Sequence, residues 1–261
     1  MSWLWLVAVG GWLAAHEAAA RSRAAGQETG RRGTGRLCWY AAGALLAVIG
    51  EPPLSALAHR ALWAETAQFG ILAFGVVPLA VLGWPRVGGR RLLRSGVRSD
   101  SRARVLAGTA ALACYLAVTI GWRVPPAVDA AVSGRGWLAL ETVTLLGGSW
   151  WLWSVLVGRS ASLPRTGRIA LATVATWSVW VFAYVLGFSA HPFYPAFAAG
   201  GAPVAAQEVA VGVLLGTSAI AFCPVMFLNL IRWLSADQAA AEAEMGRYLD
   251  PFQAMGGRVH D

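Results

Sequence analysis

The chain lacks lysine entirely and has only three cysteines among its 261 residues. The missing lysine excludes a seven-helix retinal protein, because retinal is held as a Schiff base on a lysine side chain. All 21 basic residues are therefore arginine, and with the abundant Ala and Gly this composition is typical of a GC-rich bacterial genome. Cys38, Cys114 and Cys223 lack paired spacing, so neither a disulfide framework nor a zinc motif is present.

Charge is also scarce. Charged residues make up 13% of the chain, whereas a soluble domain carries about 25%. Hydrophobic residues make up 57%, and they gather in runs near the roughly 20 residues that cross a bilayer as a helix. The runs are too long and too uniformly apolar for barrel strands, which alternate. The sequence predicts an all-α, seven-helix membrane bundle with spans at 2–20, 37–57, 61–83, 105–122, 137–157, 169–188 and 207–233.

The arginines predict the orientation of this bundle. Eighteen of the 21 lie in alternate gaps between the spans or in the C-terminal tail, and the other side has only Arg60, Arg123 and Arg135. Such a bias marks the cytoplasmic side. We expect the N-terminus outside and the C-terminus in the cytoplasm of a bacterial cell, with the plasma membrane as the chain's environment. The net charge of +8 comes from arginines that follow this membrane topology. Nucleic acid is therefore not expected as a partner.

The chain is expected to form one transmembrane domain over residues 1–234 and a short cytoplasmic tail over 235–261. The first apolar run has no positive charge before it, which favours an uncleaved first helix over a signal peptide. The last helix is expected to continue into the tail as far as Gly246 and to end before Asp250-Pro251.

Three glutamates in the odd-numbered spans are predicted to share one depth near the outer surface. Glu65 and Glu141 each lie four residues into a span, about 6 Å below its boundary at a rise of 1.5 Å per residue, and Glu208 begins the last span. A single glutamate there could reach up to the headgroups. Three at one level favour a shared cavity, because ionisable groups at membrane depth usually face the bundle interior.

Other polar residues lie at the same level and suggest a metal or proton site. Gln68 and Gln207 are next to the glutamates, and His59 and His191 lie in the outer loops. Carboxylate and imidazole ligands suit Zn(II) or Cu(II). The candidate metal-binding set is Glu65, Gln68, Glu141, Glu208, His59 and His191. Cys223 and Met226, on one face of the last span, are an alternative site for Cu(I), with core packing as the simpler explanation.

Several segments resemble the CtaG-type cytochrome c oxidase assembly proteins associated with caa3 oxidases. The resemblance follows chain order over most of residues 45–240, and it is carried by E-P-P-L at 51–54, A-E-T-A-Q-F at 64–69 and G-W-P at 83–85. It continues with L-E-T at 140–142, G-G-S-W-W at 147–151, Gln207-Glu208 and Arg232-Trp233. It implies a seven-helix membrane protein that helps to mature a copper-containing oxidase, with oxidase subunits as partners.

The departures from this family concern its histidines. Where the family has H-M-x-Q-H, this chain has Glu65 and Phe69 in place of the two histidines and keeps Gln68. The family's histidine near Glu141 is also missing, with Thr142 nearest to its position. The resemblance therefore indicates a divergent member whose metal site is altered or lost.

Three functions stay open at this point. The first is an assembly factor for a copper-containing oxidase, with copper or zinc as candidate ligand. The second is a structural membrane subunit that has lost its metal site, and the third is a proton-linked transporter. A transporter is disfavoured because no inverted repeat and no inward series of polar residues is visible. An enzyme is not expected, because no nucleophile–base pair or phosphate-binding loop occurs.

Overall fold

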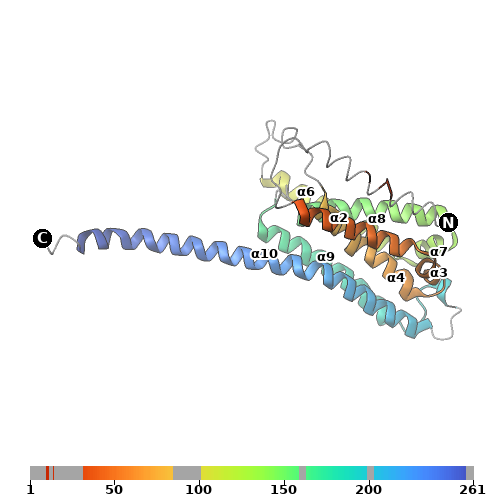
Figure 1. Cartoon of the computed structure of the whole chain (residues 1–261). Helices are drawn as coiled ribbons and strands as arrows, with labels where there is room; N and C mark the ends of the chain where they lie inside the picture. Colours follow the sequence, from red (N-terminus) through yellow and green to blue (C-terminus); the bar gives the residue numbers. More distant parts are fainter. Residues whose placement is uncertain are drawn as a thin grey trace.

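The computed structural model describes residues 32–84, 101–158, 163–198 and 203–256, together with Gly10, Gly11 and Ala14. Within these ranges all regular structure is helical, and no strand occurs. The helices run nearly side by side in one bundle, and the last of them extends far beyond it (Figure 1). An all-α architecture is therefore confirmed for the described part of the chain.

The chain order of the elements is simple, with long helices joined by short helical connections. The elements are α2 (Arg32–Gly50), α3 (Pro52–Ala58), α4 (Leu62–Gly70), the π-helix η1 (Ile71–Val76), α5 (Val77–Gly83), α6 (Ser101–Gly121), α7 (Pro125–Ser133), α8 (Arg135–Leu156), α9 (Arg165–Gly187), the 3₁₀ turn η2 (Pro195–Phe197) and α10 (Pro203–Gly256).

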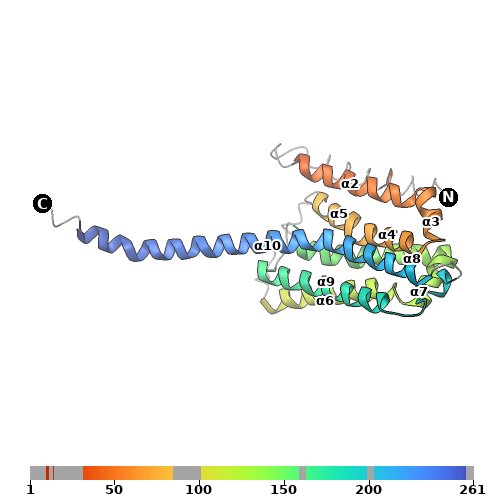
Figure 2. The ribbon, with the colours of Figure 1, turned by 90° about the horizontal axis from the view of Figure 1, so that it is seen from below.

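The packing places α10 against α9 and α4, α2 against α5 and η1, and α6 against α8 and α9. The short helices α3 and α7 both lie at one end of the bundle, as Figures 1 and 2 show. The projecting part of α10 leaves the bundle from the opposite end. Each long helix thus connects two ends with different surroundings, which is the arrangement a membrane protein requires.

Four helical segments are long and apolar enough to cross a membrane: 62–83, 101–121, 165–187 and 203–246. They correspond to the predicted spans at 61–83, 105–122, 169–188 and 207–233. Helix α8 matches the predicted span 137–157 in length, but it is not among these four segments. Large apolar side chains such as Val143 and Ile220 are exposed on the outside of the bundle, as lipid contact would require.

The predicted span 37–57 is wrong as a single helix. The structure divides it into α2 and α3 at Glu51, whose backbone is extended with φ −68° and ψ 146°. The physical reason is Pro52, because a proline disfavours the helical conformation of the residue before it. The apolar part that remains in α2 runs over 34–50.

The third predicted span contains an irregularity that is caused by Pro78. The N–H of Val77 bonds to the carbonyl of Leu72, five residues back, which defines the π-helical turn. The next carbonyl, that of Ala73, would accept from residue 78, but a proline has no N–H. The indole Nε1 of Trp153 on α8 donates to it instead, at 3.0 Å. A buried backbone group is thereby satisfied across a helix interface.

Trp153 also forms the centre of the core. Its ring stacks on Phe222 of α10 with centroids 4.8 Å apart, and Phe74 and Tyr115 meet Phe222 edge-on. These four side chains come from α8, α10, η1 and α6, so the core joins helices that are distant in sequence.

The predicted first span, 2–20, lies largely outside the described residues. Of the predicted first span, only Gly10, Gly11 and Ala14 are described, and they are helical. The prediction that Asp250-Pro251 ends the last helix is wrong, since α10 continues to Gly256. A proline removes one helical hydrogen bond, and the remaining bonds can carry the helix past it. The domain boundary at residue 234 stays a prediction.

Glycine is required where α2 crosses α5. A Cβ added to Gly83 would lie 2.6 Å from the backbone nitrogen of Trp39 and 2.9 Å from the carbonyl oxygen of Gly35. Both are backbone atoms, so the two helices would have to separate. At Gly147 on α8, by contrast, nothing lies within 4 Å of an added Cβ.

We therefore expect Gly83→Ala to lower the stability of the protein in detergent by about 1–3 kcal/mol, the usual cost of overpacking. Gly147→Ala is the matched control and should leave it unchanged or slightly raised, because alanine favours helix. Thermal unfolding of both variants measures the difference. Equal melting temperatures would contradict the close α2–α5 contact.

Candidate functional site

Two of the predicted glutamates meet at the end of the bundle where α3 and α7 lie, and an arginine joins them. Glu65 comes from α4, Glu141 from α8, and Arg123 from the connection between α6 and α7. The Nη1 atom of Arg123 donates to Oε2 of Glu65 at 2.8 Å, and its Nη2 atom bonds to Oε1 of the same carboxylate. Nη2 also lies 3.6 Å from Oε1 of Glu141. We call these three residues the Glu–Arg–Glu cluster.

Two members of the cluster are buried and the third, Glu65, is part-buried. Only 2% of the surface of Arg123 and 7% of that of Glu141 is exposed. Charges removed from water in this way are costly unless they are paired, and the paired geometry of Glu65 and Arg123 supplies the compensation. Chemically the cluster is an ion-pair network of two carboxylates around one guanidinium, and no open reactive group results.

Local sequence explains how Arg123 reaches this place. Its backbone continues the last turn of α6, with its N–H bonded to the carbonyl of Ile120, and Pro125 then holds Val124 extended. The guanidinium carbon lies 4.0 Å from the centre of the Phe69 ring. Because Phe69 follows Glu65 by four residues on α4, one helix face supplies both the carboxylate and the aromatic ring.

The connection between α9 and α10 also contacts the cluster. The hydroxyl of Tyr194 donates to the backbone carbonyl of Arg123 at 2.9 Å. Burial raises the pKa of Tyr194 to about 12, so the hydroxyl keeps the proton that it donates. Nearby, the N–H of Ala196 donates to Oδ1 of Asp129 on α7 at 3.1 Å. The outer connections are thus fastened to one another around Arg123.

The two glutamines of the candidate site are engaged elsewhere. The amide of Gln207 donates to the carbonyl of Leu186 at 2.6 Å and accepts from the N–H of Phe193 at 2.8 Å, which holds the α9–α10 connection in place. Nε2 of Gln68 donates to the carbonyl of Ile49 at 2.7 Å. That carbonyl would otherwise bond to residue 53 in a continuous helix, but Pro53 has no N–H.

The remaining candidates lie at the surface. His59, His191 and Glu208 are all exposed side chains. In the part of the chain that the structure describes, three or more His, Cys, Asp or Glu side chains do not come close enough together to hold a metal ion. The structure therefore brings Glu65 and Glu141 together and does not add the histidines or Glu208 to them in such a group.

Sequence reasoning missed Arg123, the residue on which the site depends. It counted this arginine only as one of the three on the outer side. A signal was available: Arg123 directly follows a predicted span, at the boundary just above the two glutamates, and surplus carboxylates at that depth need a cation.

A line of buried hydroxyls continues inward from the cluster, which the sequence analysis did not anticipate. Thr119 and Tyr115 precede Arg123 on α6 at intervals of four residues, and Ser149 lies on the facing helix α8. All three side chains are buried. They extend the polar interior toward the centre of the bundle.

Comparison with known protein families shows which family the chain resembles. The family model of the cytochrome c oxidase caa3 assembly factor matches residues 16–236, which is most of the chain. Among curated proteins and among solved structures the chain has no significant match.

We expect Arg123→Gln to destabilise the protein strongly, by about 3–5 kcal/mol, because it leaves the buried carboxylate of Glu141 and the part-buried carboxylate of Glu65 without their cation. The matched control is Arg135→Gln, which removes the same charge from an exposed position at the same end of the bundle. The stability of both variants is measured by their thermal unfolding in detergent. Similar stability of the two variants would show that Arg123 is not an essential counter-ion.

Proposed function

The chain belongs to the cytochrome c oxidase caa3 assembly factor family, and we propose that it is a membrane-embedded factor that helps to mature a copper-containing cytochrome c oxidase. The observation that carries this proposal is the family match, which covers 16–236 and so includes every residue of the Glu–Arg–Glu cluster. The ion-paired character of the cluster favours a role in assembly over catalysis.

We further propose that the chain crosses the plasma membrane of a bacterial cell seven times, with its N-terminus outside. Among the described residues, six long helical passes support this number: α2, α4 to α5, α6, α8, α9 and α10. The predicted first span would be the seventh. The distribution of arginine supports the orientation, because Arg104, Arg165 and Arg232 lie at the end from which α10 projects.

The Glu–Arg–Glu cluster would hold the outer face of the bundle in one shape. It joins α4, α8 and the α6–α7 connection directly, and through Tyr194 it joins the α9–α10 connection. Around it lie exposed residues that a partner could contact, among them His59, His191 and Glu208. We propose that oxidase subunits are recognised at this face.

The charges of the cluster do not fit a metal ion between Glu65 and Glu141. The guanidinium of Arg123 already occupies the space between the carboxylates, and its positive charge would repel a divalent cation. Copper or zinc binding by Glu65, Gln68, Glu141, Glu208, His59 and His191 stays a prediction, which titration of the purified protein with Cu(II) or Zn(II) can test.

A structural membrane subunit is the second candidate. It is favoured by the way in which Glu65, Gln68 and Gln207 are all used in holding helices and connections together. In that case the surface residues around the cluster would have no role of their own.

Deletion of the gene in its native host should lower caa3-type oxidase activity in membranes, and the wild-type gene should restore it. A triple variant with His59→Ala, His191→Ala and Glu208→Gln should accumulate normally, because all three side chains are exposed, but should restore less activity. Lipid-facing Val143→Ala and Ile220→Ala serve as the control. Full restoration by the triple variant would favour the structural subunit, and undiminished activity after deletion would contradict the assembly role.

The orientation can be tested with single cysteines in a chain whose native Cys38, Cys114 and Cys223 have been replaced by alanine. Ser133→Cys and Ser235→Cys place exposed thiols at opposite ends of the bundle, separated by α8, α9 and part of α10. A membrane-impermeant maleimide should label residue 133 in intact cells and residue 235 only after permeabilisation. Labelling of both from one side would contradict the three intervening crossings.

A further inference from the structure

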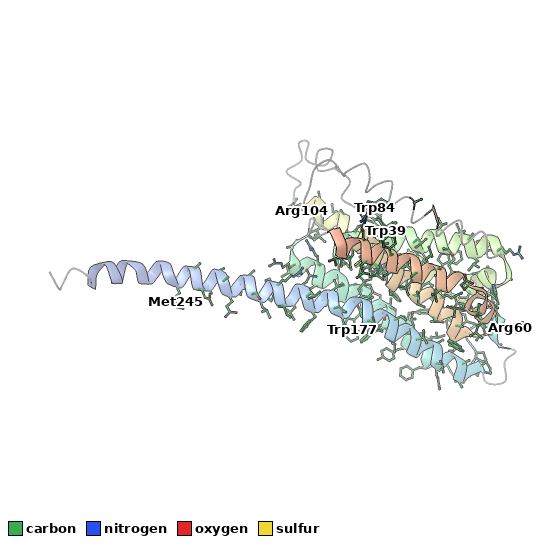
Figure 3. All side chains as sticks on the ribbon, in the orientation of Figure 1. Trp39, Arg60, Trp84, Arg104, Trp177 and Met245 are labelled. Carbon is green, nitrogen blue, oxygen red and sulfur yellow. The ribbon has the colours of Figure 1, made fainter. Side chains whose placement is uncertain are left out.

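The end of the bundle opposite the Glu–Arg–Glu cluster contains a cavity of about 300 Å³. Its lining comes from the start of α6 and from the segment before α9. We call it the Arg104 cavity, and it is lined by Ser101, Arg104, Val105, Leu163 and Pro164. Figure 3 shows Arg104 at this end and Arg60 at the other.

The wall of the Arg104 cavity is fixed by two contacts. Leu163 packs over Gly108, where an added Cβ would lie 2.7 Å from the Cδ1 atom of Leu163. The Nε atom of Arg168 donates to the carbonyl of the same leucine at 3.1 Å. The segment before α9 is therefore held against α6, and the cavity between them is part of the folded structure.

Positive charge gathers around this cavity. Arg165 directly follows Pro164, and its guanidinium donates to the backbone carbonyl of Arg232 at 2.6 Å. The positive charges of Arg165 and Arg232 both lie near enough to Arg168 to repel its guanidinium. Both α6 and α9 begin here, so their N–H groups and dipoles add to the positive potential. Such a concentration of cations is suited to an anion, above all to a phosphate.

The cavity also has an apolar side that a free phosphate would not use. Val105 lines it and is 53% exposed, and the next residue, Leu106, is 67% exposed. Both belong to a helix long and apolar enough to cross a membrane. A charged surface thus lies next to an apolar surface. A phospholipid has the matching arrangement, with a charged headgroup next to apolar acyl chains.

We propose that the Arg104 cavity binds the phosphate headgroup of an anionic phospholipid, whose acyl chain lies along Val105 and Leu106. Arg104 and Arg165 supply the charge that selects an anionic lipid over a zwitterionic one. This site is separate from the Glu–Arg–Glu cluster, and it does not depend on the proposed role in oxidase assembly.

Native mass spectrometry of the purified full chain in detergent tests this proposal. Phosphatidylglycerol should be retained, whereas phosphatidylcholine should be lost at the same concentration. An Arg104→Gln, Arg165→Gln variant should bind phosphatidylglycerol about 25-fold more weakly, because each arginine near an anionic lipid contributes on the order of a factor of five. Val105→Asn should also weaken binding, although it leaves the charge unchanged.

The matched control is Arg60→Gln, Arg135→Gln, which removes the same charge from exposed positions at the other end. It should bind phosphatidylglycerol as the wild type does. Equal losses in the two double variants would overturn the proposal in favour of non-specific attraction. Displacement of the lipid by millimolar inorganic phosphate, with Val105→Asn unaffected, would overturn it in favour of a free-phosphate site. Equal retention of phosphatidylcholine would show that charge does not select the lipid.

Discussion

The buried guanidinium of Arg123 is the constraint on which the rest of this bundle depends. An arginine that is almost fully enclosed is tolerated only with carboxylates beside it, and carboxylates at this depth are equally costly alone. Each group thus requires the other, and Glu65, Glu141 and Arg123 come from three separate parts of the chain. The pairing fixes the relative positions of α4, α6 and α8 at one end, while apolar contacts would allow them to slide.

The same need to satisfy polar groups explains the other irregularities of the chain without invoking a ligand. Pro53 and Pro78 each leave a carbonyl without its helical partner, and side chains from other helices, Gln68 and Trp153, donate to those carbonyls. The side chain of Gln207 also bonds to backbone groups, those of Leu186 and Phe193, and thereby holds the connection between α9 and α10. Residues that look like site residues by polarity and depth therefore hold the scaffold together. This favours a factor that acts by presenting a defined surface over one that acts by chemistry.

Much of the fold could be predicted from the sequence, because apolar runs of membrane length leave few alternatives to a helix. The runs at 61–83, 105–122 and 169–188 end within a few residues of the observed helices. The sequence also placed Glu65 and Glu141 at one depth, although it did not show that they face each other. The partner that joins them could not be derived in the same way, because depth says nothing about which side of a helix a residue faces. The hydrogen-bond donors to the carbonyls of Ile49 and Ala73 could not be predicted either, because they come from helices that are adjacent only in the folded structure.

A double-mutant cycle between Glu65 and Arg123 is the most direct measurement of this central pairing. The free energy of unfolding would be measured in bicelles for the wild type, Glu65→Gln, Arg123→Gln and the double variant. If the two residues depend on each other, the double variant will be more stable than the sum of the single losses predicts, with a coupling energy of about 1.5 kcal/mol or more. Losses that add to within about 0.5 kcal/mol would contradict the pairing and leave the bundle without its proposed electrostatic centre.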